Sequence, residues 1–229
     1  MKLLALDCST EACSVALLDD DQGELEIIET TEAAARQHTR RLLPLVDSLL
    51  ADAGVALSQL DAIAFGRGPG SFTGLRICLG AVQGLAFGAD LPVVPVSTLA
   101  ALAQTAVNAG HHAPMIISTL DARMDEIYWA VYSAQEQGVE LVDIERLTAP
   151  EQLLEGHSLD LATTVAVGSG FHYGDRIGAT SELKTWHADI LPSAKAIAQL
   201  ARRDYLLGKT CRADKALPTY LRDEVAWQQ

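Results

Sequence analysis

Basic residues are scarce in this chain of 229 residues, which has 17 Lys and Arg against 30 Asp and Glu and a net charge of −13. A strong grip on nucleic acid relies on Lys and Arg, so the charge argues against tight nucleic-acid binding by this chain alone. No apolar run approaches the length of a membrane span, and the carboxylate of Asp7 comes too early for a signal peptide. These absences predict a soluble cytoplasmic protein.

The spacings typical of catalytic and metal sites are also missing. The cysteines form no Cys-x-x-Cys pair, the histidines form no His-x-x-x-His, and Gly-x-Ser-x-Gly does not occur. We therefore expect no metal ligands, no catalytic set and free buried thiols. The four cysteines are Cys8, Cys13, Cys78 and Cys211.

A glycine-rich segment from Phe65 to Arg76, FGRGPGSFTGLR, is the most informative feature that is present. A buried strand at 61–65 and a helix at 75–87 are predicted on its two sides, which would place its amides at a helix N-terminus, where anions bind. The segment lacks the lysine of a phosphate-binding Gly-x-x-x-x-Gly-Lys-[Ser/Thr] loop and the third glycine of Gly-x-Gly-x-x-Gly. Anion binding is therefore the lesser interpretation of this loop. Its candidate residues are Gly68, Gly70, Ser71, Thr73 and Arg76.

The helix after this loop carries glycines at a spacing of four, Gly80, Gly84 and Gly88, which places them on one face. Each glycine costs a helix roughly 0.8–1 kcal/mol relative to Ala, and close approach of another helix could compensate for this cost. Either another helix of this chain or another subunit could approach, and the sequence leaves both open. The face opposite the glycines is predicted to carry Leu75, Leu79, Val82 and Phe87.

A second amphipathic helix is predicted over 34–53, with Leu42, Val46 and Leu49 on one face. Pro44 lies inside it and predicts a kink or two helices that meet there. Together the two helices form the predicted partner interface. Its residues are Leu42, Val46, Leu49, Arg76, Gly80, Gly84 and Gly88.

Both halves of the chain show three strands, a helix, a strand, a glycine turn and a helix, which suggests a duplicated lobe. We place the boundary after residue 108, giving lobes at 1–108 and 109–229, with the C-terminal segment packing back on the first lobe. The predicted strands are 3–6, 13–18, 24–30, 61–65, 115–120, 125–132, a strand within 138–147, and 163–167, and the remaining helices are 98–107, 150–154 and 193–207.

Two polar groups follow predicted strands. Asp121, Arg123 and Glu126 could form a site at a strand end, but a turn held by salt bridges is the favoured interpretation. The segment from Asp7 to Thr10 could approach a phosphate or form a hydrogen-bonded hairpin turn, and both alternatives stay open.

Six stretches together resemble the TsaB family, also called YeaZ, in order along nearly the whole chain. They are LDCSTEACSVAL at 6–17, HTRRLLP at 38–44, GRGPGSFTGLRI at 66–77, VSTL at 96–99, LDARMDEIY at 120–128 and YLR at 220–222. The glycine loop with its helix is quite specific to that family. The first stretch is shared with the wider superfamily of actin-like ATPases and glycoproteases.

The resemblance implies an α/β fold of two ribonuclease-H-like lobes, of the actin/Hsp70-like ATPase type, with mixed sheets flanked by helices. It implies a non-catalytic scaffold subunit that binds the catalytic sibling TsaD and the ATPase TsaE, and pairs with itself when alone. TsaD transfers a threonylcarbamoyl group to adenosine 37, next to the anticodon, in tRNAs that read codons beginning with A. This chain would hold no cofactor of its own, ATP or ADP would bind in the complex, and tRNA would be met only through the complex. The alternative function is an actin-like ATPase or a glycoprotease-like peptidase that acts alone.

Overall fold

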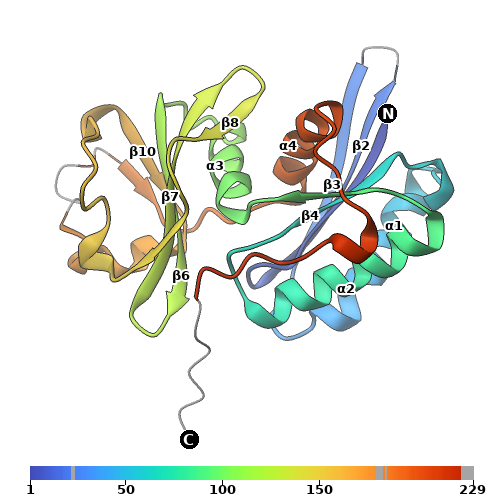
Figure 1. Cartoon of the computed structure of the whole chain (residues 1–229), viewed down its shortest axis with the longest axis horizontal. Helices are drawn as coiled ribbons and strands as arrows, with labels where there is room; N and C mark the ends of the chain where they lie inside the picture. The colour runs from blue at the N-terminus through green and yellow to red at the C-terminus, as the bar shows by residue number, and fades with distance from the viewer. Residues whose placement is uncertain (22–23, 179–182, 184, 223–229) are drawn as a thin grey trace, which may run out of the picture.

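A computed structural model of the chain describes residues 1–21, 24–178, 183 and 185–222. Two mixed β-sheets stand side by side, the first on the right of Figure 1 and the second on the left. The elements of the first half are β1 (Lys2–Asp7), β2 (Ala12–Asp21), β3 (Glu24–Ala33), α1 (His38–Asp52), η1 (Leu57–Gln59), β4 (Ala62–Gly66), α2 (Phe72–Ala89), β5 (Val93–Val96) and α3 (Thr98–Asn108).

The second half is built mainly from strands and short 3₁₀ helices, written η. Its elements are β6 (Met115–Arg123), β7 (Glu126–Gln135), β8 (Gly138–Leu141), β9 (Arg146–Thr148), η2 (Pro150–Gln152), η3 (Leu161–Thr163), β10 (Thr164–Val167), η4 (Ser169–Arg176), β11 (Thr185–His187), α4 (Ala194–Leu206) and η6 (Ala213–Lys215).

The two sheets share one strand order. The first sheet runs β3-β2-β1-β4-β5, with β1, β4 and β5 parallel and β2 and β3 antiparallel to their neighbours. The second runs β8-β7-β6-β10-β11 with the same parallel and antiparallel pairs, and β9 pairs with β7 beside this path. The predicted duplication of the strands and the predicted α/β fold with two mixed sheets are confirmed.

Helices cover the two sheets unequally. On the outer face of the first sheet, α1 and α2 close a core that includes Leu4, Leu6, Val15 and Phe65. On the outer face of the second sheet, the 3₁₀ elements close a smaller core around Trp129. The predicted helix at 150–154 is accordingly only the 3₁₀ turn η2.

A third core lies between the sheets and is shared by both halves. Helix α4, from the second half, packs on β1, β2, β4 and β5 of the first sheet, whereas α3, from the first half, packs on β6, β7 and β8 of the second. Figure 1 shows both helices between the sheets. The division into lobes at 1–108 and 109–229 stays a prediction, and residues 179–182, 184 and 223–229 of its second part lie outside the described residues.

The two predicted partner helices differ from expectation in detail. Helix α1 is one helix with Pro44 inside it, rather than two helices that meet at the proline. Helix α2 begins at Phe72, three residues before the predicted start, because the Ser71 side chain caps it by accepting a hydrogen bond from the amide of Gly74 at 3.3 Å.

The expectation that no segment reaches the length of a membrane span is wrong for α2. Among the described residues, this helix of 18 residues is long and apolar enough to cross a membrane by length and composition, with a mean hydropathy of 1.3. Only 28% of it is buried within the chain. One such helix is weak support for a span, and its buried residues, including Cys78, Leu79 and Val82, pack on the first sheet.

Candidate functional site

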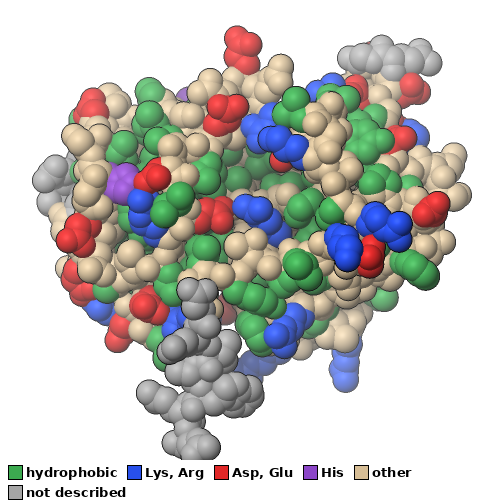
Figure 2. Space-filling view, in the orientation of Figure 1, with side chains coloured by type: hydrophobic (Ala, Val, Ile, Leu, Met, Phe, Trp, Pro, Cys, Tyr) green, Lys and Arg blue, Asp and Glu red, His purple; other side chains and the backbone are tan. Residues whose placement is uncertain are grey.

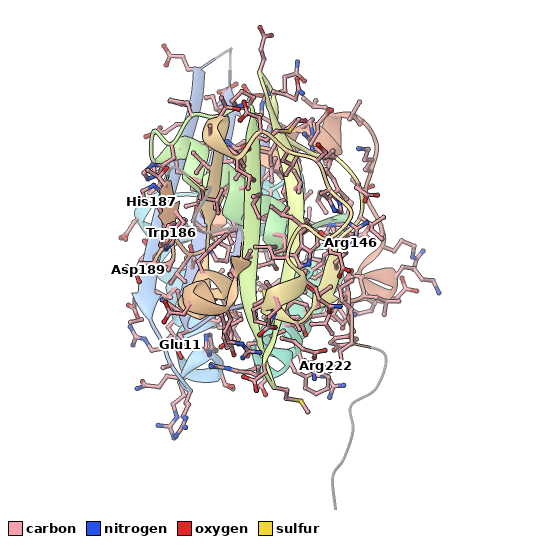
Figure 3. The ribbon with its side chains drawn as sticks, turned by 90° about the vertical axis from the view of Figure 1, so that its left-hand side faces the viewer. Glu11, Arg146, Trp186, His187, Asp189 and Arg222 are labelled. Carbon is pink, nitrogen blue, oxygen red and sulfur yellow. The ribbon has the colours of Figure 1, made fainter. Side chains whose placement is uncertain are left out.

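A cleft of about 1360 Å³ opens at one end of the molecule, where the two halves meet. Its lining comes from the β1–β2 turn, the N-termini of α1 and α2, the β6–β7 turn and the C-terminal strap, which we define as residues 217–222. The strap crosses from η6 toward β6 in Figure 1. Glu11 of the β1–β2 turn and Arg222 of the strap both lie at the lower end of the molecule in Figure 3.

The glycines of the loop between β4 and α2 allow this loop to pack directly on the β1–β2 turn. A Cβ atom on Gly74 would stand 1.9 Å from the carbonyl oxygen of Cys8, and one on Gly70 would stand 2.6 Å from that of Ser9. Gly68 has φ +104° and lies against the backbone oxygen of Thr219. The absence of side chains at these positions is therefore explained by contacts within the chain.

Four of the five predicted anion-binding residues, Gly70, Ser71, Thr73 and Arg76, line the cleft, whereas Gly68 does not. Two loop amides that an anion would need are already engaged, because the Ser71 amide donates to the Ser9 carbonyl at 2.7 Å and the Gly74 amide donates to the Ser71 hydroxyl. The loop is thus organised first for packing, and anion binding stays a prediction.

Arg76 belongs to an aromatic cluster at the start of α2. Its guanidinium lies 3.7 Å from the centre of the Phe72 ring, and its Nε donates to the hydroxyl of Tyr220 at 3.2 Å. The rings of Phe72 and Tyr220 are 5.4 Å apart, and both residues are partly exposed. Tyr and Arg are enriched among residues that dominate binding energy at protein interfaces, so this cluster suits a contact surface.

Asp7 ends β1 as a buried carboxyl group. Its Oδ2 accepts from the hydroxyl of Ser9 at 2.8 Å, while its Oδ1 has no hydrogen-bond partner among the described residues. Burial raises the pKa of Asp7 to about 7, although the hydrogen bonds from Ser9 lower it. A Cβ on Gly66 would stand 2.2 Å from Oδ1, so the carboxyl faces the end of β4 within the protein.

The group around Asp121 is a turn held by salt bridges, as the favoured interpretation of the sequence predicted. Arg123 pairs with Asp121 at 2.9 Å, and Glu126 pairs with Arg222 of the strap at 2.5 Å. Arg123, Met124 and Asp125 all have positive φ, a conformation that costs roughly 1–2 kcal/mol per residue. Arg222 supports this turn by donating to the carbonyl oxygens within it.

The second candidate surface is the outer face of α2. Gly80, Gly84 and Gly88 are exposed, and a Cβ on any of them would meet no described residue within 4 Å. No other helix of the described chain covers this face, so the alternative of packing within the chain is wrong. Figure 2 shows hydrophobic side chains at the surface over α1 and α2, interspersed with Lys and Arg.

The predicted interface needs a correction on α1. Leu42, Val46 and Leu49 are buried in the core against the first sheet, with Leu42 only 1% exposed, so a partner cannot reach them. Their regular spacing marked the inward face of the helix. The outward face instead presents Leu43, which is 49% exposed.

Phe87 was also misplaced by the sequence analysis. It was expected to pack inward with Leu75, Leu79 and Val82, yet it is 82% exposed at the C-terminal end of α2. In the helical period, position 87 lies between the buried Leu79 and Val82 row and the glycine row, one residue before Gly88. Its spacing of three residues from Gly84 and seven from Gly80 could have indicated this. Among the described residues, no group of three or more His, Cys, Asp or Glu side chains is arranged to hold a metal ion.

Comparison with known proteins places the chain in a family. Residues 27–227 match the model of the TsaD family, described as tRNA N6-adenosine threonylcarbamoyltransferase. The chain is 43% identical over its whole length to the tRNA threonylcarbamoyladenosine biosynthesis protein TsaB of Haemophilus influenzae, covering 97% of that protein. It is 39% identical to the protein of the same name from Escherichia coli, covering 98% of it.

A solved structure supports the same assignment. YeaZ from Pseudomonas aeruginosa superposes with a TM-score of 0.89 at 44% identity, over 96% of this chain and 99% of that one. These similarities extend over nearly the whole chain. They therefore include the cleft and the glycine loop with the helix α2 that follows it. The chain therefore belongs to the TsaB (YeaZ) family of tRNA threonylcarbamoyladenosine biosynthesis proteins.

Proposed function

We propose that this chain is a non-catalytic subunit that serves tRNA threonylcarbamoyladenosine formation by binding the catalytic sibling TsaD. TsaD would transfer the threonylcarbamoyl group to adenosine 37 of tRNAs that read codons beginning with A. The observation that carries the proposal is the open glycine face of α2, flanked by the exposed rings of Phe72 and Phe87.

The energetics of this face favour a partner. Three exposed glycines cost the helix roughly 2–3 kcal/mol in total relative to alanine, with no compensating contact inside the described chain. Glycines let the backbone of a second helix approach closely, and exposed apolar surface of this kind marks interaction sites. A partner helix packed along α2 would compensate for the low helix propensity of the glycines and would bury the exposed apolar surface. The corrected interface comprises Leu43, Phe72, Arg76, Gly80, Gly84, Phe87 and Gly88.

The remaining parts of the proposal concern the other partners. With a net charge of −13, the chain would meet tRNA only through the complex. The ATPase TsaE would join the same complex, ATP or ADP would bind there rather than to this chain alone, and the free chain would form a homodimer. The complex would work in the cytoplasm.

The test mixes the full chain with purified TsaD and measures mass by light scattering. The proposal expects a complex at micromolar concentration and predicts that Gly84→Leu abolishes it, because the leucine side chain would hold the partner helix away. Gln137→Leu, which places the same side chain at an exposed position in the turn between β7 and β8, is the matched control.

A thermal melt followed by circular dichroism confirms that both variants are folded. Absence of a complex with the unmodified chain would contradict the scaffold role. Unchanged pairing of a folded Gly84→Leu variant would instead exclude the glycine face as the interface.

A further inference from the structure

Three buried cysteines meet beneath the β1–β2 turn. Cys8 and Cys13 stand one position beyond Asp7 and Ser14, the last paired residues of β1 and β2, so they face each other across the hairpin. Their sulfur atoms are 3.7 Å apart, and both residues are fully buried. Cys78 of α2 is buried in the same core as these two cysteines.

This arrangement is close to that of a disulfide. Directly opposed residues of an antiparallel pair have Cβ atoms about 4.5–5.5 Å apart, whereas a disulfide needs about 3.5–4.5 Å. Closing the bond would require the sulfur atoms to approach from 3.7 Å to about 2 Å. The position of Cys78 on a separate helix offers no such cross-strand geometry.

The turn closed by these cysteines supports both outer helices. The carbonyl of Ser9 accepts the amide of Ser71 at 2.7 Å, and the carbonyl of Cys8 packs against Gly74 in the first turn of α2. On the other side, Nε2 of His38 lies 3.0 Å from the carbonyl oxygen of Thr10, at the start of α1. A displacement of the turn would move the N-termini of both helices, because closely packed contacts transmit such displacements.

We propose that Cys8 and Cys13 form a disulfide under peroxide and that this bond weakens pairing through α1 and α2. The formation of the bond stands independently, whereas its effect on pairing rests on the proposed function. Thus the pair would make the contact surface sensitive to oxidation.

The chemistry balances with hydrogen peroxide as the oxidant. The thiolate of one cysteine attacks a peroxide oxygen, the O–O bond breaks, and a sulfenic acid forms with release of hydroxide, which takes up the proton that the thiol lost. The second thiol, losing its proton, attacks the sulfenic sulfur and expels a second hydroxide, which leaves as water. Two thiols thereby lose two electrons, and one peroxide becomes two waters.

Burial sets the pace of this reaction. The contact with Cys8, together with burial, raises the pKa of Cys13, so little thiolate is present at neutral pH. Access would come from the cleft, whose lining includes Ser9 and Thr10 of the same turn. We therefore expect slow oxidation by a small oxidant and none by a bulky disulfide reagent on the same timescale.

Mass spectrometry of the intact fold tests the bond. The full chain is incubated with excess peroxide, and catalase then removes the peroxide. The protein is denatured in N-ethylmaleimide, which labels every free thiol, and is digested with trypsin. Cys8 and Cys13 share the peptide 3–36, while Cys78 lies in 77–123 and Cys211 in 210–212. The expected product is unlabelled peptide 3–36 that has lost two hydrogen atoms and regains both labels after reduction.

Two outcomes would overturn the bond. One is full labelling of both thiols after Cys211 has been oxidised. The other is a crosslink between peptides 3–36 and 77–123, which would show that Cys78 is the partner. Neither result depends on any binding partner, so neither bears on the scaffold role.

Light scattering with TsaD tests the effect on pairing. We expect oxidised chain to bind roughly tenfold more weakly than reduced chain, with recovery on addition of dithiothreitol. Cys13→Ala should bind equally before and after peroxide, while Cys211→Ala should behave as the unmodified chain does. Equal binding of the fully disulfide-bonded and reduced chains would overturn the regulatory part. Failure of the reduced chain to bind TsaD would instead contradict the proposed function. If Cys13→Ala does not fold, recovery of binding by the oxidised chain on addition of dithiothreitol still tests the effect of the disulfide.

Discussion

The two sheets share a strand order but differ in what covers their outer faces. The first is covered by α1 and α2, which span 15 and 18 residues, and the second by 3₁₀ elements and loops. The covering of the second sheet closes a core around Trp129, whereas α2 closes a core on one side and leaves an apolar, glycine-rich side open. Duplication therefore explains the framework of strands, while the helices that only one half has carry the candidate contact surface.

The two halves also differ in the polar residue that follows the last paired position of each central strand, β1 and β6. Leu6 pairs with Phe65 in the first sheet, and Ser118 pairs with Val167 in the second, so the next residues, Asp7 and Thr119, correspond. The hydroxyl of Thr119 donates to the carbonyl of Val167 at 3.2 Å, whereas Oδ1 of Asp7 has no partner among the described residues. Within the described part of the chain, the second half thus satisfies its polar group here, whereas one carboxyl oxygen of the first half has no partner.

The largest expected effect tests whether the glycines after β4 and β10 are equally constrained. An alanine Cβ would stand 1.9 Å from the Cys8 carbonyl oxygen at Gly74 and 2.0 Å from the Thr119 carbonyl oxygen at Gly168, where φ is also +99°. Because backbone cannot move aside cheaply, Gly74→Ala and Gly168→Ala should each lower the free energy of unfolding by about 3 kcal/mol or more. Urea denaturation followed by circular dichroism measures this, and a loss at only one site would show that the close backbone contact at the other site is not needed for stability.

The next effect concerns the pH dependence of stability. Because Asp7 has a folded pKa of about 7 against an ordinary value of 3.8, the folded state holds its proton more tightly, so stability falls as pH rises from about 4 to about 7. Asp7→Asn removes this loss and should raise the free energy of unfolding by a few kcal/mol at pH 8, with little change at pH 4. Urea melts across pH 4–8 measure it.

The matched control for Asp7 is its counterpart in the second half. Thr119→Val removes a hydrogen bond from a neutral group, so it should lower stability by about 1 kcal/mol at every pH. If Asp7→Asn showed an equally flat difference, the carboxyl would not be held protonated by burial.

The smallest effect sharpens the contrast between packed and open glycines within one helix. Gly84→Ala adds a methyl group where no atom of residues 1–21, 24–178, 183 or 185–222 lies within 4 Å, so the isolated chain should gain about 0.8–1 kcal/mol of stability from helix propensity alone. Thermal unfolding at a low protein concentration measures the gain. A loss of stability would show that the glycine face is already covered in the free chain, as it would be in a homodimer.

Local patterns in the sequence predicted most of the framework. Alternating and buried apolar runs located the strands, and Ser97 and Ser193 mark the N-caps of α3 and α4 in the structure. The duplicated order was also recoverable, because the three leading strands and the glycine turns recur in both halves. These features depend on contacts near in sequence, which periodicity reports directly.

The candidate surface was predicted only in part, because a hydrophobic stripe does not say what it faces. The stripe of Leu42, Val46 and Leu49 had the spacing of an interface but packs on the first sheet. The glycine stripe was correctly placed on one face, but only the fold shows that this face is open. The loop glycines suggested a ligand, whereas their actual neighbours are carbonyls of a turn some sixty residues earlier, which no local pattern specifies.

The exchange of α3 and α4 between the sheets has a consequence for how the molecule can be divided or deformed. Each half supplies the inner cover of the other, so a chain cut after residue 108 would yield two fragments that each lack a wall of their core. Such fragments should be recovered as folded material only when expressed together. The same interlocking means that the cleft cannot widen by simple hinging without exposing the shared core, so any partner would find a surface of fixed shape.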